Sequence, residues 1–76
     1  MAEIIETLDQ LWNWADEHGN AKLKGLINRL KYSDRADEQI LALASIIRAL
    51  RKHRLKYSEH FVRHCLLYLF SAEEVD

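Results

Sequence analysis

The sequence predicts an all-α domain, a small antiparallel bundle of three to four short helices that forms a dimer. Apolar residues recur at helical spacing along nearly the whole chain. The 76 residues include no proline and only two glycines, so little interrupts a helix. A chain this short buries only about 60% of the surface that its unfolded form exposes, so we expect a second copy to supplement the core.

The charged residues are sorted along the chain. Residues 1–20 sum to −5, residues 21–56 to +7 and residues 57–76 to −3, which gives the net charge of −1. Such sorting indicates contacts between oppositely charged surfaces, within the chain or with a partner. It is not the composition of a chain that binds polyanions along its whole length.

The first two helices are expected at about residues 3–18 and 21–32. In the first, Ile4, Leu8, Leu11 and Ala15 form one apolar stripe, and Gly19 suits the left-handed residue after a helix end. Asn20 can cap the second helix, whose apolar stripe is narrow and is flanked by lysines and arginines. We therefore expect the second helix to lie at the periphery.

The third and fourth helices are expected at about residues 36–53 and 59–70, with Ser33 or Asp34 as the cap of the third. Both have broad apolar faces, and that of the third spreads over roughly 220° of the helical wheel. Ser58 followed by Glu59 resembles a new helix start, but one continuous helix over 36–70 is also compatible with the sequence. Residues 71–76 are expected to be a frayed acidic tail, and the single domain spans 1–76.

The broad apolar faces predict a protein-binding surface, because a monomer of four short helices has too few neighbours to cover both. Trp14 lies about 120° from the centre of the first apolar stripe and is expected to act as an exposed anchor. The residues expected to contact a partner are Trp14, Ile46, Leu50, Leu67 and Phe70.

A basic segment at residues 48–56 is the second candidate surface. Its side chains could orient an acidic protein partner or neutralise nucleic-acid phosphates, and the sequence leaves both possibilities open. Nucleic-acid binding is the less favoured of the two, because the third helix begins with acidic residues that would repel phosphates. The residues expected to make these contacts are Arg48, Arg51, Lys52, Arg54 and Lys56.

The sequence contains little that points to catalysis or to a cofactor. His60 and His64 are spaced to share a metal ion, but a third ligand is missing, so they are weak candidates and we expect no metal. Cys65 lies within an apolar run, which favours a buried, unreactive thiol. We expect no cofactor and no enzymatic activity.

The lone cysteine and the absence of an apolar run of membrane-spanning length are typical of a cytoplasmic protein that does not enter a membrane. The sequence therefore predicts a small non-enzymatic interaction module. It would act as a regulator, adaptor or inhibitor by helix packing and charge complementarity. The alternative is a transcriptional regulator that binds nucleic acid through residues 48–56.

Overall fold

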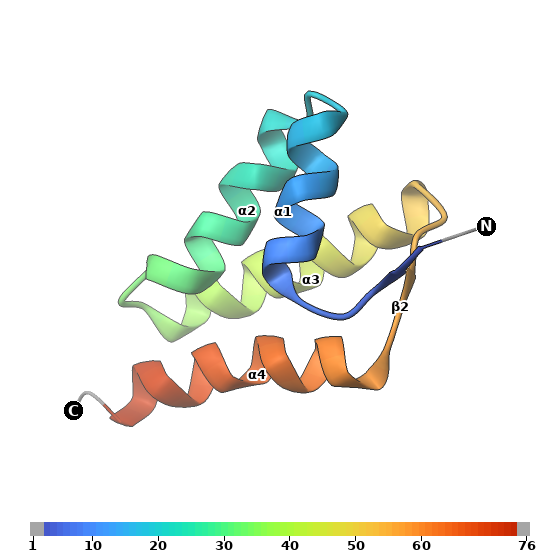
Figure 1. The fold of residues 1–76 in the computed structure, drawn as a ribbon. Coiled ribbons are helices and arrows are strands. Elements are labelled where there is room, and N and C mark those ends of the chain that lie inside the picture. The colour runs from blue at the N-terminus through green and yellow to red at the C-terminus, as the bar shows by residue number, and fades with distance from the viewer. Residues whose placement is uncertain (1–2, 75–76) are drawn as a thin grey trace.

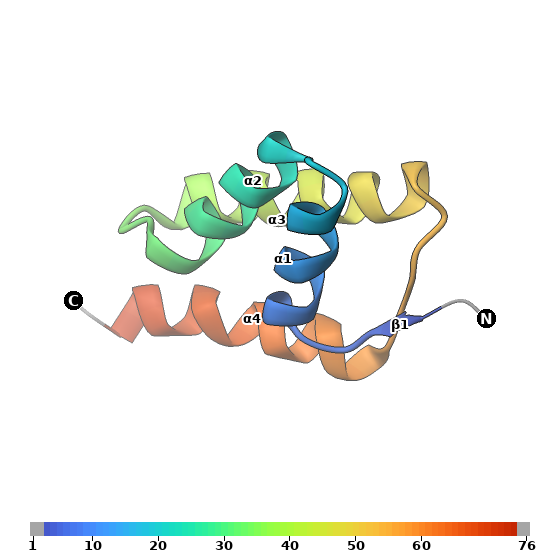
Figure 2. The ribbon, with the colours of Figure 1, turned by 45° about the horizontal axis from the view of Figure 1, so that its top comes forward.

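The described residues fold into four helices, which confirms the all-α class (Figures 1 and 2). The structure is a computed structural model that describes residues 3–74, with side chains described up to residue 69. The helices are α1 (Leu8–Glu17), α2 (Ala21–Tyr32), α3 (Ala36–Lys52) and α4 (Glu59–Glu74). The Cα atoms extend over 43 × 24 × 17 Å, so the molecule is about two helices thick.

The sequence suggested that the first helix begins near residue 3, but helix α1 begins at Leu8. Thr7 is in an extended conformation, and its hydroxyl accepts a hydrogen bond from the Gln10 backbone N–H at 3.1 Å. The Gln10 side chain reaches back, accepting from the Glu6 N–H and donating to the Ile4 carbonyl, both at 2.9 Å. The Thr7 contact satisfies one backbone donor in the first turn of the helix, and the Gln10 side chain holds the preceding residues extended.

The extended residues before α1 form strand β1 (Ile4–Ile5), which pairs in parallel with β2 (Lys56–Tyr57). Ile4 is opposite Lys56 and Ile5 is opposite Tyr57, and the Ser58 N–H donates to the Ile5 carbonyl at 3.0 Å. This short pair ties the N-terminal segment to the connection between α3 and α4. Ile5 is thereby buried in the core.

The corner between α1 and α2 is built by Gly19 and Asn20. Gly19 has φ +64°, and the Asn20 N–H donates to the Ala15 carbonyl at 2.8 Å, so the chain reverses directly after α1. The Asn20 side-chain carbonyl accepts from the Leu23 N–H and caps α2.

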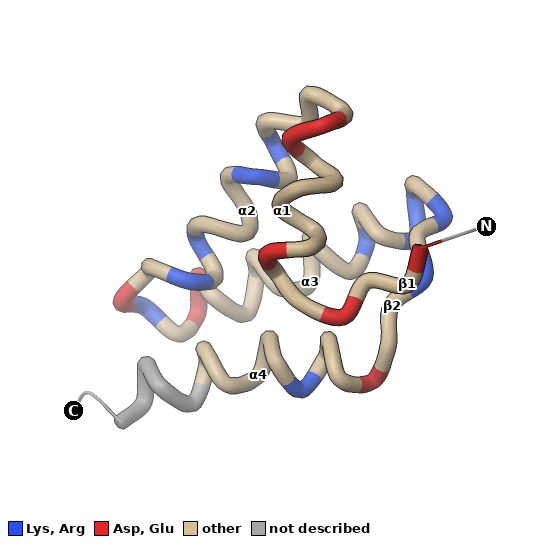
Figure 3. The backbone as a smooth tube through the Cα atoms, in the orientation of Figure 1, with Lys and Arg blue, Asp and Glu red and all other residues tan. Residues whose placement is uncertain are grey.

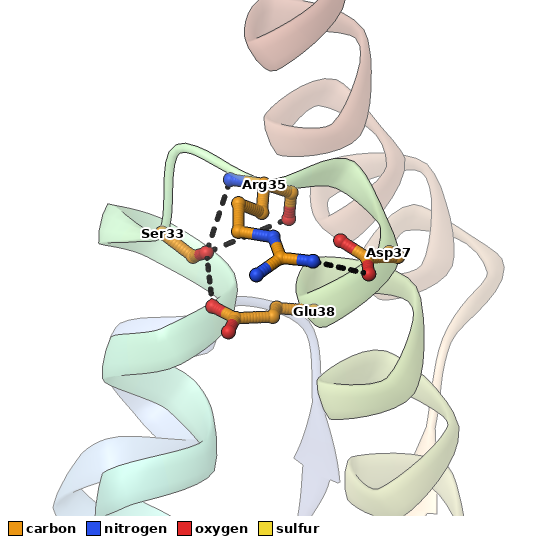
Figure 4. A network of polar contacts seen from close by, with 4 residues as sticks. All are labelled: Ser33, Arg35, Asp37 and Glu38. Atoms are coloured by element: carbon orange, nitrogen blue, oxygen red, sulfur yellow. Dashed lines mark hydrogen bonds and ion pairs between the residues drawn. The ribbon is translucent and has the colours of Figure 1, made fainter.

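The corner between α2 and α3 is closed by a small polar network (Figure 4). The Ser33 hydroxyl donates to the Glu38 carboxylate at 2.9 Å and accepts from the Arg35 backbone N–H at 3.2 Å. The Arg35 guanidinium pairs with Asp37 at 3.1 Å. The residue at the N-cap of α3 is Arg35, which makes no side-chain cap, so the expected cap by Ser33 or Asp34 was wrong. Ser33 instead stabilises the turn that precedes the helix.

Residues 36–70 form two helices separated by a break, and not one continuous helix. Arg54 adopts φ +56°, and the Leu55 N–H donates to the Leu50 carbonyl at 2.8 Å, which ends α3. The Ser58 hydroxyl then accepts from the Phe61 N–H at 3.2 Å at the start of α4. Helix α4 continues to Glu74, so residues 71–74 are helical and not frayed, while residues 75 and 76 lie outside the described part.

All four helices contribute to one hydrophobic core. Phe61 and Cys65 enter it from α4, and Gln39 is the buried polar residue within it. The other core residues come from β1 and the first three helices: Ile5, Leu8, Leu11, Ala15, Leu23, Ile27, Leu30, Ala42, Ile46 and Leu50. Each helix therefore turns a narrow stripe of buried residues toward the core. Helices α3 and α4 also carry apolar residues outside this stripe.

Candidate interaction surfaces

Two of the predicted contact residues belong to the core and not to the surface. Ile46 and Leu50 are both 0% exposed and pack with residues of the other helices. They lie on the inward stripe of α3, whose other buried positions are Gln39 and Ala42. The apolar pattern of α3 is broad, but the pattern does not show which half of the apolar face points toward the core.

The outward apolar side chains of α3 are Ile40, 56% exposed, and Leu41, 67% exposed. Ala44 is also exposed, one turn further along the helix. On α4, which contacts α3, the predicted residue Leu67 is 62% exposed. The side chain of Phe70 lies outside the described residues. Exposed large apolar side chains on two neighbouring helices are typical of an association surface.

Trp14 is half-buried and already has neighbours within the chain. Its ring stacks on the His18 ring with 4.1 Å between centroids, and the His53 ring lies tilted at 5.1 Å. The His18 ring nitrogen Nδ1 donates to the Trp14 carbonyl at 2.8 Å, and the Asn20 side chain lies 3.5 Å from His53. Trp14 thus connects the corner between α1 and α2 to the end of α3.

The acidic residues of α1 pair with lysines of α2. Asp16 contacts Lys24 at 2.9 Å and Asp9 contacts Lys31 at 3.5 Å. Burial lowers the pKa of Lys31, but electrostatic attraction to Tyr32, Tyr68 and Asp9 and the hydrogen bond to Asp9 outweigh it, so this pKa lies above its ordinary value. Asp9 and Asp16, two of the three acidic residues of α1, therefore pair with α2 and not with the basic segment 48–56.

The basic segment has no acidic partner within the described residues. Figure 3 shows Lys and Arg along α2 and from the second half of α3 through β2. In the described part of the chain, four basic side chains form ion pairs, namely Lys24, Lys31, Arg35 and Arg63. None of those described in residues 48–56 does, nor do Lys22 and Arg29 of α2. The predicted charge contacts Arg48, Arg51, Lys52 and Arg54 are exposed, as is Lys56 in β2.

A groove lies between α2 and α3, beside this basic segment. Its volume is about 230 Å³. Leu23, Leu26 and Ala49 give it apolar walls, while Lys22, Arg48 and Lys52 place three cations at its edge. Asn20 and His53 line one end. Lys22 could not be predicted as part of this surface, because the sequence pattern does not show that α2 packs beside the end of α3.

Helix α4 carries His60, His64 and Cys65, the residues considered above for metal binding and reactivity. The His60 and His64 rings lie 6.4 Å apart, and the His64 ring meets Tyr68 edge-on. Among the residues that the structure describes, no group of three or more His, Cys, Asp or Glu side chains could hold a metal ion. Burial raises the pKa of the Cys65 thiol to about 12, so it stays protonated at neutral pH.

Comparison with known proteins adds no family assignment: no family model, no curated protein and no solved structure matches this chain. Within the described residues, none of the helices has the length and apolar character needed to cross a membrane.

Proposed function

We propose that the protein is a small non-enzymatic interaction module. It self-associates through the outward apolar residues of its C-terminal helices and binds an acidic protein partner through the groove between α2 and α3. The proposal of an acidic partner rests on one observation. Exposed cations, including Lys22, Arg48 and Lys52, have no acidic partner within the described residues. A regulator, adaptor or inhibitor is the role that such a module would serve.

The groove suits a peptide segment that carries both carboxylates and an apolar side chain. Cations at the edge attract carboxylates and set the orientation of the partner, while Leu26 and Ala49 offer a surface for an apolar group. The apolar part of the groove lining favours a protein partner over a polyanion.

The test uses two labelled peptides of equal negative charge, one with a central leucine and one with serine in its place. Binding, measured by fluorescence anisotropy, should be tighter for the leucine peptide than for the serine peptide. Substituting Arg48→Gln together with Lys52→Gln should weaken binding about tenfold, since each exposed charge contact contributes about 0.2–1 kcal/mol. The control Arg63→Gln removes one cation from α4, where it pairs with Glu59, and should leave binding unchanged.

Nucleic-acid binding is the second candidate function, and the concentration of unpaired cations at residues 48–56 favours it. Two observations weigh against it. Helix α3 begins with Asp37 and Glu38, which would repel phosphates, and the Trp14 ring already lies against His18 and His53, so it offers little stacking surface to a base. An oligonucleotide that binds more tightly than either peptide, with a steep loss as salt increases, would favour this alternative.

A further inference from the structure

The outward face of α3 has an acidic start, an apolar middle and a basic end. Asp37, Ala44 and Arg51 follow one another at intervals of seven residues, which is 20° short of two full turns. They therefore lie within about 40° of one another on the helix. All three are exposed. Beside Ala44 lie Ile40 and Leu41, which are the exposed large apolar residues of this helix.

The charges at the two ends of this face are available to a partner. Arg51 forms no ion pair with the described residues. Among the described residues, Asp37 forms an ion pair with Arg35 alone, and both side chains are about two-thirds exposed, so the pair is weakly held. The small side chain of Ala44 at the centre permits another helix to approach closely. The face thus combines complementary ends with a centre that favours packing.

We propose that α3 pairs with α3 of a second copy, in the opposite direction and about a two-fold axis at Ala44. Asp37 and Arg51 are each seven residues, about 10 Å, from Ala44, so the axis places Asp37 of each copy opposite Arg51 of the other. The same axis places Ile40 beside Ile47, which is half-buried in the monomer, because both lie on the same side of the pairing at nearly the same height. On the other side it brings Arg48 over Leu41, where the aliphatic part of the arginine covers the apolar side chain.

A second copy fits this face better than an unrelated partner does, because the face is complementary to itself when reversed. A parallel pairing would oppose Asp37 to Asp37 and Arg51 to Arg51, which is repulsive. The inference rests on the proposed self-association and specifies its geometry. In this geometry the groove between α2 and α3 stays open to the acidic partner. Arg48 lies at the boundary and belongs to both surfaces.

Sedimentation equilibrium at low salt tests the pairing by exchange of charges. Asp37→Arg alone, or Arg51→Asp alone, creates two like-charge contacts by symmetry and should raise the dimer dissociation constant at least about tenfold. The double variant Asp37→Arg with Arg51→Asp restores opposite charges and should return the constant to within about threefold of the original. Asp34→Arg, which changes an exposed acid in the corner before α3, is the matched control and should have little effect.

Two further variants separate the pairing from general changes in stability. Leu41→Gln removes an exposed apolar side chain and should weaken the dimer while the thermal unfolding of the monomer stays the same. Ala44→Glu places like charges at the axis and should abolish association. A dimer that tolerates Ala44→Glu and both single charge reversals would overturn this geometry but leave self-association standing. A chain that stays monomeric at every concentration would overturn both.

Discussion

The side-chain amide of Gln39 donates a hydrogen bond to the backbone carbonyl of Leu30 at 3.0 Å, which joins the first turn of α3 to the last turn of α2. The same amide lies 3.4 Å from the Tyr68 carbonyl on α4. Gln39 is buried, and its side-chain oxygen meets no donor among the described residues. One amide group thus connects three helices at the end of the molecule remote from β1 and β2.

Gln39→Glu should destabilise the fold by about 2–4 kcal/mol at neutral pH, because an ionised carboxylate has no proton to donate and would face two carbonyls in the core. Burial would raise the pKa of the new carboxyl group above its ordinary value. The variant should therefore recover stability as the pH falls and lose it as the pH rises past the ordinary pKa of glutamate. Urea unfolding at several pH values measures this effect; equal loss at every pH would contradict it.

Gly25→Ala should stabilise the fold by about 0.5–1 kcal/mol. Gly25 lies inside α2 without a left-handed backbone, and an added Cβ would meet nothing within 4 Å. Gly19→Ala is the contrasting variant, because Gly19 has φ +64° and an alanine there would be strained. The midpoint temperature of thermal unfolding should rise for Gly25→Ala and fall for Gly19→Ala.

Arg54→Gly should also stabilise the fold, by about 1 kcal/mol, because it relieves a left-handed backbone at a residue with a side chain. Gly19 occupies the corresponding position after α1, so the chain uses glycine at one of the two turns and arginine at the other. The measurement is the free energy of unfolding in denaturant. If Arg54 contributes to binding an acidic partner, the same variant should weaken peptide binding while it strengthens the fold.

The Cys65 thiol should resist alkylation near pH 8 until the protein unfolds, because it is buried and its pKa is raised from 9.0 to about 12. A thiol whose folded pKa lies above its unfolded pKa favours folding fully below pH 9 and loses that contribution as the pH rises toward 12. The rate of reaction with a thiol reagent, with and without denaturant, checks the protection. Rapid labelling of the folded protein would contradict it.

The sequence predicts the helices well where a local signal sets their ends. Asn20 and Gly19 mark the corner between α1 and α2, and Ser58 marks the start of α4. The start of α1 was missed, although Thr7 and Gln10 have the spacing of a capping box that would have placed it. The strand pair could not be predicted, since two residues carry too little periodicity and the pairing joins segments 52 residues apart.

The surfaces were harder to predict than the helices. Ile46 and Leu50 were expected outside and are buried, whereas Ile40 and Leu41 on the same helix are exposed. Periodicity shows that α3 has a wide apolar face, but tertiary packing decides which half of that face meets α2 and α4. The basic side chains of residues 48–56 have no acidic partner among the described residues, and this likewise depends on the pairing of Asp9 and Asp16 with α2, which is a property of the fold.

The most direct test of the account is the molar mass of the unmodified protein in solution, measured by sedimentation equilibrium over a wide range of concentrations. A self-associating module with exposed apolar residues on α3 and α4 should approach twice the chain mass of 9.0 kDa as the concentration rises. A single species of 9.0 kDa at the highest concentration reached would contradict the central claim.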